Sequence, residues 1–240
     1  MNIFVSSTDA EAGKTFVTAG LAAIMQSLGY KAGVYKPVQT GADDSHGFLV
    51  SPDIAFVKNI DPYVECVCSY TLRTSAAPAI GAELENITIE PKVILKDYKN
   101  LEHKCDTVIV EGSEGLLVPV TPRMRMGDII QLLELPVIFI VTPQFGNINS
   151  TLLTLNQAKM MDIKTTGVIV NKYPYYMNDI AIKSVPRMIE EYSDAKVLGI
   201  IKEFPNPSSI TPGELIATML NSVDIEKIFN VPIPKLSLGL

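Results

Sequence analysis

The chain is poor in the residues that mark several protein classes. It has no tryptophan, two histidines and three cysteines, and its 20 Lys and Arg residues are outnumbered by 26 Asp and Glu residues. No basic block indicates nucleic-acid binding, and Cys66, Cys68 and Cys105 lack both the C-x-x-C spacing of a zinc site and the even number of a disulfide framework. His46 and His103 lie far apart in the chain, which favours solvated or structural histidines over metal ligands.

Long apolar segments are also missing. The longest apolar runs, such as 137–141, have the length of a strand and fall far short of the ~20 residues of a membrane helix. Charged residues come before any long apolar stretch at the N-terminus, which argues against a signal peptide. We therefore expect a globular, cytoplasmic protein that binds neither nucleic acid nor membranes, and its 47% hydrophobic residues allow a substantial core.

Apolar, β-branched runs alternate with helical patterns along the chain. These runs are hydrophobic throughout, which is typical of strands covered on both faces and predicts a largely parallel sheet. Strands are predicted at 3–5, 32–35, 107–110, 137–141, 167–170 and 197–201, and helices at about 14–28, 52–60, 89–103, 127–134, 150–161, 178–192 and 212–221. This order predicts a doubly wound α/β fold in one domain, 1–240, with its chemistry at the carboxyl ends of the strands.

The segment after the first predicted strand has features of a phosphate-binding loop. It runs from Ser7 to Thr15, ends in Gly-Lys-Thr and leads into an apolar helical pattern that begins at Phe16. A loop that enters a helix N-terminus turns free N–H groups toward an anion, while Lys14 can neutralise phosphate charge and the Thr15 hydroxyl can hold Mg²⁺. The strict pattern G-x-x-x-x-G-K-[ST] requires glycine at Thr8, so the loop departs from it.

Polar side chains also follow the later predicted strands. Lys36-Pro-Val-Gln-Thr40 follows the second strand, where the proline is expected to end strand pairing and leave Lys36 and Thr40 at the edge that carries the loop. Glu111 ends the third strand and is well placed to bind Mg²⁺ beside a phosphate loop. Asp53 is interpreted as a helix N-terminal acid unless other features point elsewhere. Asn171 either caps a turn or binds the edge of a base.

Together these motifs resemble dethiobiotin synthetase, the ATP-dependent ring-closing enzyme of biotin biosynthesis. That family carries G-T-D-T-x-x-G-K-T, K-P-V-x-[ST]-G, V-E-G-A-G-G with a following V/T-P element, and G-x-I-N-H-[TA]-L-L-T after successive strands. The chain has S-T-D-A-E-A-G-K-T from residue 7, K-P-V-Q-T-G from 36, V-E-G-S-E-G from 110 and G-N-I-N-S-T-L-L-T from 146. The resemblance implies a P-loop NTPase-like fold of the SIMIBI type, ATP and Mg²⁺ as cofactors, and 7,8-diaminononanoate and CO₂ as substrates.

The resemblance also implies roles for individual residues. The implied sites are Gly13, Lys14, Thr15, Phe16, Glu111 and Asn171 for the nucleotide; Thr15, Asp53 and Glu111 for Mg²⁺; Glu11, Lys14, Lys36 and Thr40 for catalysis; and Lys36, Thr40, Gly146, Asn147 and Asn149 for the substrate. Asn171 resembles the family's adenine-binding asparagine. The segment from Gly146 to Asn149 resembles one that grips the substrate carboxylate from the neighbouring subunit, which implies a homodimer with shared active sites.

Four positions depart from the family pattern, and two alternatives to a synthetase stay open. Ser7 replaces the first glycine, Ala10 a threonine and Glu114 a glycine, while Ser150 stands where histidine is common. These changes keep a non-catalytic nucleotide-binding relative as one alternative, although the lysines and acids expected to stabilise charge are intact. A ParA- or MinD-like regulatory ATPase is the other. Such proteins carry a lysine early in the loop and, when they bind membranes, a basic amphipathic tail, whereas residues 231–240 contain two prolines and one lysine.

Overall fold

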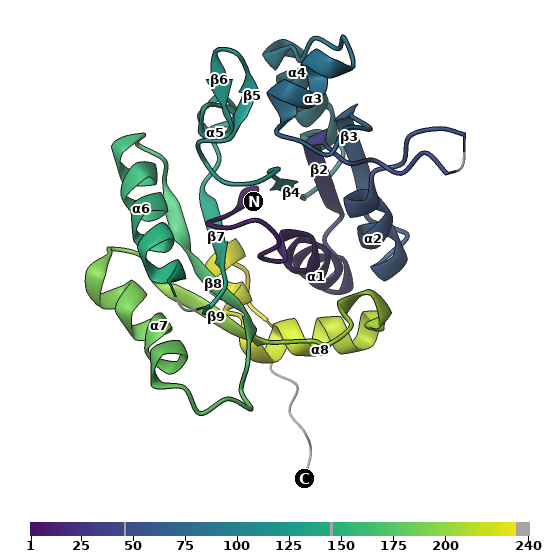
Figure 1. Cartoon of the computed structure of the whole chain (residues 1–240). Helices are drawn as coiled ribbons and strands as arrows, with labels where there is room; N and C mark the ends of the chain where they lie inside the picture. Colours follow the sequence, from purple (N-terminus) through teal and green to yellow (C-terminus); the bar gives the residue numbers. More distant parts are fainter. Residues whose placement is uncertain (46, 145, 234–240) are drawn as a thin grey trace.

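One seven-stranded parallel sheet forms the centre of the computed structural model, which describes residues 1–45, 47–144 and 146–233 (Figure 1). The strand order is β3-β2-β4-β1-β7-β8-β9. The strands are β1 (Ile3–Ser7), β2 (Ala32–Gln39), β3 (Glu65–Thr71), β4 (Thr107–Glu111), β7 (Val137–Val141), β8 (Thr165–Tyr173) and β9 (Val197–Lys202), and a separate antiparallel pair joins β5 (Pro119–Thr121) to β6 (Met124–Arg125). His46 and the tail from 234 onwards, where the sequence suggested a solvated histidine and no amphipathic helix, lie outside the described residues.

Helices cover both faces of the sheet, as the doubly wound prediction requires. One face packs against α1 (Lys14–Ser27), α2 (Pro52–Ile60), α8 (Pro212–Ser222) and α9 (Ile225–Phe229). The other packs against α3 (Pro78–Leu84), α4 (Pro91–Glu102), α5 (Met126–Leu133), α6 (Asn147–Met160) and α7 (Ile180–Tyr192). Strands β1, β4 and β7 are buried at every residue, which explains the apolar runs 3–5, 108–110 and 137–141 that they contain. No helix among the described residues has the length and apolar character needed to cross a membrane.

The predicted helices are all present, and most of their ends shift by one or two residues. The largest shift is in α6, which begins at Asn147 and not at 150. Gly146 precedes it with a φ of 91°, a left-handed conformation that glycine adopts without strain and that starts the helix early. The parallel sheet with helices on both faces confirms the predicted fold class.

Several smaller elements were missed by the sequence analysis. Strand β3 lies at the edge of the sheet, and its sequence E-C-V-C-S-Y-T is only partly buried, so it lacks the continuous apolar pattern of the central strands. Helix α3 has seven residues and the β5–β6 pair has short strands, which leaves too few residues for a recognisable period.

The expectation that Pro37 ends strand pairing is wrong on one side of β2. Pairing with β3 continues as far as Gln39, which lies opposite Thr71. On the other side, pairing with β4 stops at Tyr35, opposite Val110. A proline lacks only its own N–H, so the strand can continue where that missing donor faces no partner strand. The last residues of β2 consequently extend beyond β4 and form a wall of the site described below.

Candidate active site

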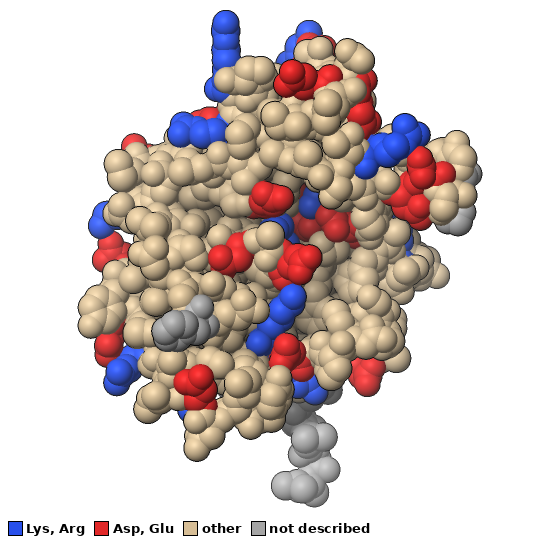
Figure 2. Space-filling model, viewed as in Figure 1, with Lys and Arg blue, Asp and Glu red and all other residues tan. Residues whose placement is uncertain are grey.

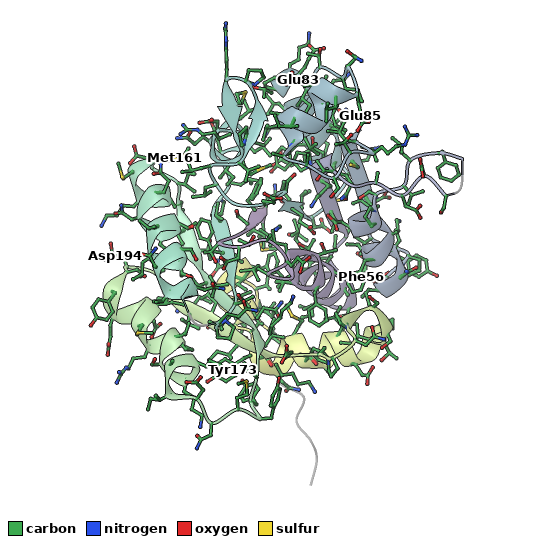
Figure 3. The ribbon with its side chains drawn as sticks, viewed as in Figure 1. Phe56, Glu83, Glu85, Met161, Tyr173 and Asp194 are labelled. Carbon is green, nitrogen blue, oxygen red and sulfur yellow. The ribbon has the colours of Figure 1, made fainter. Side chains whose placement is uncertain are left out.

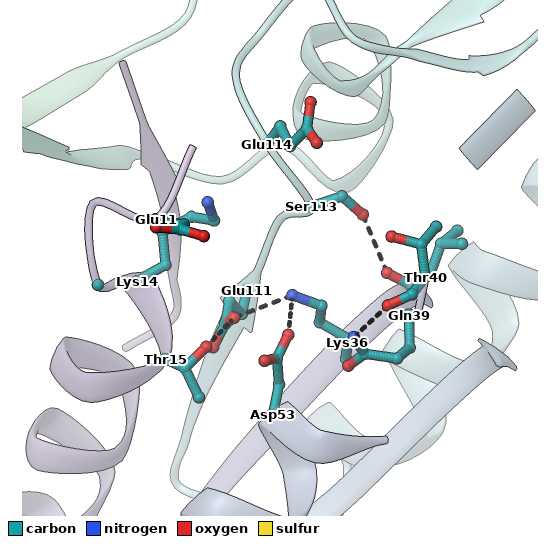
Figure 4. A pocket seen from close by; sticks show the side chains of 12 residues that line it. Glu11, Lys14, Thr15, Lys36, Gln39, Thr40, Asp53, Glu111, Ser113 and Glu114 are labelled. Carbon is teal, nitrogen blue, oxygen red and sulfur yellow. Dashed lines mark hydrogen bonds and ion pairs between the residues drawn. The ribbon is translucent and has the colours of Figure 1, made fainter. Parts of the chain in front are cut away.

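A hollow of about 250 Å³ lies at the carboxyl ends of β1, β2 and β4, where doubly wound sheets bind their ligands. Figure 2 shows acidic side chains gathered around a hollowed part of this face, with basic atoms among them. The hollow is lined by Glu11, Gly13, Lys14, Thr15, Lys36, Val38, Gln39, Thr40, Asp53, Glu111, Ser113 and Glu114 (Figure 4). It therefore brings together the first three sequence motifs and the N-terminal turns of α1 and α2.

The loop after β1 turns into α1 at Gly13. This residue has a φ of 88°, and a Cβ atom there would lie 2.2 Å from Nδ2 of Asn171, so only glycine fits. Glu11 is also left-handed, with a φ of 56°, which is a strained conformation for a residue with a side chain. Among the described residues no side chain caps α1, and its first turn holds no acidic residue. The free N–H groups and the positive end of the helix are thus left for an anion.

Lys36 joins two carboxylates in a buried cluster, which we call the Lys36 trio: Lys36, Asp53 and Glu111. Its Nζ lies 2.6 Å from Oδ2 of Asp53 and 2.9 Å from Oε1 of Glu111 (Figure 4). It also donates to the carbonyl oxygen of Gly112 at 3.1 Å. The Thr15 hydroxyl donates to the same Oε1 of Glu111 at 2.8 Å. Strands β2 and β4 and helices α1 and α2 are therefore linked at one point by polar side chains.

The trio contains one more carboxylate than ammonium groups, and its pKa shifts reflect burial and the ion pairs. Burial disfavours the charged form of Lys36, but Glu111 and Asp53 outweigh it and raise the pKa of Lys36. Burial raises the pKa of Glu111, and Lys36 offsets that effect only in part. Burial also opposes the charge on Asp53, yet Lys36 holds the pKa of Asp53 below its usual value. A further cation at this point would be attracted by the uncompensated negative charge.

The oxygen atoms of Thr15, Asp53 and Glu111 are suited to hold Mg²⁺. Oε2 of Glu111 is buried and has no hydrogen-bond partner among the described residues, so one carboxylate oxygen is left for another ligand. The Thr15 hydroxyl and Asp53 supply oxygen atoms beside it, and oxygen is the ligand that Mg²⁺ prefers. The described side chains form no cluster of three or more His, Cys, Asp or Glu residues suited to a metal, so phosphate oxygens or water would complete the coordination.

Lys14 stands apart from these ion pairs. Its Nζ donates to Oγ of Ser7 at 3.0 Å, and within the described chain it has no carboxylate within 4.0 Å. Burial lowers the pKa of Lys14, and the nearby charge of Lys36 lowers it further. An ammonium that is largely buried and not neutralised by a carboxylate favours an anionic ligand.

A second cavity of about 140 Å³ lies on the other side of Gly13. It is lined by Gly13, Phe16, Asn171, Lys172, Lys202, Phe204 and Pro207. The rings of Phe16 and Phe204 have centroids 5.4 Å apart, and Nζ of Lys202 lies 4.8 Å from the centroid of Phe204. Asn171 comes from β8, close to the strand end that Tyr173 marks in Figure 3, and its Nδ2 donates to the carbonyl oxygen of Ala12 at 2.8 Å. A flat aromatic ligand would suit this cavity.

The remaining predicted residues lie elsewhere. Gly146, Asn147 and Asn149 stand at the start of α6 and line neither cavity of their own chain. The side-chain amide of Asn147 instead donates to the Thr142 hydroxyl at 2.8 Å.

Glu114 lies on the rim of the hollow, and its carboxylate points away from Lys36 in Figure 4, so it does not fill the space.

Three lining residues were missed, namely Val38, Gln39 and Ser113. All three fall inside the motifs quoted above, so their positions in those motifs could have identified them as residues of the site. Gln39 accepts from the Ser51 hydroxyl at 2.6 Å and so connects β2 to the start of α2. The Ser113 hydroxyl donates to the carbonyl oxygen of Val38 at 2.9 Å and holds the segment after β4 against β2.

Known proteins are similar to this chain over most of its length. A family model described as an AAA domain matches residues 1–211. A protein of Anoxybacillus flavithermus named ATP-dependent dethiobiotin synthetase is 36% identical over 205 residues, which are 85% of this chain and 92% of that protein. The protein of the same name from Clostridium kluyveri is 32% identical over 239 residues, 95% of this chain and 94% of that one. The chain belongs to the dethiobiotin synthetase family. This family membership places it among the ATP-dependent ligases.

Solved structures show the same fold at much lower identity. The MinC:MinD cell division protein complex of Aquifex aeolicus matches with a TM-score of 0.66 and 14% identity, covering 97% of each chain. MinD of Pyrococcus horikoshii, complexed with Mg-ADP, matches with a TM-score of 0.62 and 16% identity over 95% of this chain and 96% of that one. The chain therefore has the fold of these P-loop NTPases.

Proposed function

We propose that the chain closes 7,8-diaminononanoate and CO₂ into the cyclic urea dethiobiotin, with ATP and Mg²⁺. One amine of the diamine takes up CO₂ as a carbamate, and a carbamate oxygen attacks the γ-phosphorus of ATP as ADP leaves. The second amine attacks the carbonyl carbon of this mixed anhydride, and phosphate leaves with the bonding electrons. The observation that carries the proposal is the single hollow in which Lys14, Lys36 and Glu111 meet.

In this proposal the hollow stabilises developing charge. Lys14 and the N-terminus of α1 hold the triphosphate with Gly13 and Thr15, and Lys36 faces the carbamate as it approaches. Glu11 and Thr40 line the same hollow and position the diamine. Mg²⁺, held by Thr15, Asp53 and Glu111, would neutralise phosphate charge. Holding both amines in one molecule favours ring closure without a nucleophilic side chain.

The second cavity is proposed to hold the base of the nucleotide. It shares Gly13 with the hollow, so a nucleotide can extend from one to the other across the loop. Phe16 supplies an aromatic face there. The Nδ2 atom of Asn171 already donates a hydrogen bond to the carbonyl oxygen of Ala12, so its Oδ1 atom is the one proposed to accept from an adenine amino group.

A turnover experiment tests the reaction. Phosphate release is measured with Mg-ATP alone and then with diamine and bicarbonate added, while mass spectrometry detects the cyclic urea. Release that depends on both additions, with urea formed, supports the synthetase; release without them would indicate a regulatory ATPase, and no release a binding protein. Lys14→Ala is expected to lower urea formation at least ~10²-fold by removing a cation from the phosphates.

Gly146, Asn147 and Asn149 are proposed to act in the site of a neighbouring subunit, in a homodimer. The support is that they line neither cavity of their own chain although they belong to the fourth family motif. Asn149→Asp would repel the substrate carboxylate, and Lys14→Ala would disable the nucleotide loop. If sites are shared, mixing the two inactive variants restores activity, because one site of the mixed dimer carries neither change; no restoration would contradict the proposal.

The reducing cytosol is the proposed compartment. Cys66, Cys68 and Cys105 are free thiols, which suits such an environment. Neither nucleic acid nor a membrane is part of the proposed function.

A further inference from the structure

Ser7 makes a contact that the family pattern does not supply, because the pattern has glycine at this position. Ser7 ends β1 and is fully buried. Its hydroxyl donates to the carbonyl oxygen of Asp9 at 2.7 Å and accepts from Nζ of Lys14 at 3.0 Å. A hydroxyl has one proton, so the bond to Asp9 turns the oxygen lone pairs toward the ammonium.

Asp9, whose carbonyl oxygen accepts from the Ser7 hydroxyl, is itself held in place by its side chain. Oδ2 of Asp9 accepts from the Thr8 hydroxyl at 2.7 Å. Oδ1 lies 3.2 Å from the Ser150 hydroxyl of α6, which shares its one proton with the carbonyl oxygen of Asn147 at 2.9 Å. The Ser7 oxygen is therefore fixed by a strand end on one side and by a loop tied to α6 on the other. An ammonium has three N–H donors, so two remain for phosphate oxygens while one stays bonded to Ser7.

We infer that Ser7 is a positioning residue, which holds the Lys14 ammonium at the mouth of the phosphate-binding loop through its hydroxyl. A flexible lysine loses rotamer freedom when it binds phosphate, and an ammonium held in advance loses less. The inference rests on the proposed role of Lys14 at the triphosphate. Ser7 itself is assigned no contact with the nucleotide or the diamine.

The chain offers a matched control one residue away. Ser6 lies on the same strand and is also fully buried, but its hydroxyl has no hydrogen-bond partner among the described residues. Ser6→Ala and Ser7→Ala remove the same atom from adjacent buried positions, and only the second removes a contact with Lys14.

The test is a double-mutant cycle read out as the affinity for a non-hydrolysable Mg-ATP analogue, measured by calorimetry. Ser7→Ala is expected to weaken binding about tenfold, as the loss of a hydrogen bond to a charged group does. Ser6→Ala should leave the affinity unchanged. In a Lys14→Ala background, Ser7→Ala should have no further effect, because the group it positions is gone. Ser7→Cys, whose thiol is a weak acceptor, should lie between wild type and Ser7→Ala, and it serves in place of Ser7→Ala if that variant fails to fold.

Three outcomes would overturn the inference: unchanged or tighter binding in Ser7→Ala, the same loss in Ser6→Ala, or an additive loss in the Lys14→Ala background. Because this readout needs no diamine, it is separate from the proposed reaction. A wild-type chain that binds the analogue but forms no urea would refute the proposed function. The double-mutant cycle would still decide the role of Ser7. A wild-type chain that forms urea with an unaffected Ser7→Ala would refute only the role of Ser7.

Discussion

Lys36 shows how a buried ammonium is kept charged in the hollow that we propose binds anions. Its side chain is 4% exposed and that of Glu111 is 2% exposed, while Asp53 is 25% exposed. The sequence indicated a cation and two acids near one another but not that they pair directly, because their side chains come from β2, α2 and β4 and meet only in the folded chain. Lys36 therefore has a structural role that Lys14, without a carboxylate partner in the described chain, does not share.

Lys36→Met is expected to destabilise the protein by about 3–5 kcal/mol, because it leaves Glu111 buried without its cation. The free energy of unfolding is measured by chemical denaturation. Lys99→Met is the control: Lys99 pairs with Glu102 at 2.8 Å, but its side chain is 52% exposed, so a change within about 0.5 kcal/mol is expected. Equal effects of the two substitutions would contradict a buried, charged Lys36.

Cys66 is expected to be a slow nucleophile. Burial raises the pKa of Cys66 to about 11, and Lys58 offsets this only in part. Because the unfolded chain gives up this proton first, near its ordinary value of 9.0, the thiol lowers stability as pH rises from about 9 toward 11. Alkylation of Cys66, followed by mass spectrometry from neutral pH upward, should lag behind that of the denatured chain. Equal rates near neutral pH would refute the shift.

The central strands were predictable because both of their faces are covered, and that requirement leaves an unbroken apolar sequence. Strand β3 has a neighbour on one side only and carries Glu65 and Ser69 among its apolar residues, so the same criterion does not apply to it. Helix ends were less predictable than helix positions. The early start of α6 depends on the left-handed conformation of Gly146, which no periodicity reveals.

The contact between β9 and the end of α8 is expected to tolerate no side chain at Gly199. A Cβ atom there would lie 2.5 Å from the carbonyl oxygen of Ser222 and 2.9 Å from Cα of Val223, which are backbone atoms. Gly199→Ala should therefore destabilise the protein by about 1–3 kcal/mol. Gly213→Ala is the control, because Gly213 lies in α8 with nothing within 4 Å and should gain about 0.4–1 kcal/mol. A neutral Gly199→Ala in thermal denaturation would contradict this packing.

The location of the site followed from the topology of the sheet, since the carboxyl ends of parallel strands meet at one edge. The motifs identified the residues there, and the structure places Glu11, Lys14, Lys36, Thr40 and Glu111 in one hollow. Sequence reasoning named Gly13, Phe16 and Asn171 of the second cavity but not Lys202 and Phe204, because these two come from the end of β9 and the residues after it, a segment without a quoted motif. Contacts between subunits stay a prediction from the fourth motif.

Binding of Mg-ATP is expected to stabilise the folded chain. A ligand that binds only the folded state adds about 2.7 kcal/mol at about 100 times its Kd, so Tm should rise with ATP concentration. A chelator should remove most of this rise, because Thr15, Asp53 and Glu111 would lose the cation that joins them to the phosphates. Differential scanning calorimetry measures the shift. An ATP-dependent rise that survives chelation would contradict the assigned metal site.

The strand order has a consequence for synthesis of the chain. Strand β1 lies between β4 and β7, and Ile3 finds its partner only at Ile109. As the ribosome delivers the chain from its N-terminus, a strand whose five residues are all buried in the folded protein must wait unpaired while most of the first half is made. Long-range parallel pairing of this kind is slow to form, so the strand that leads into the loop before α1 is open to aggregation in the nascent protein.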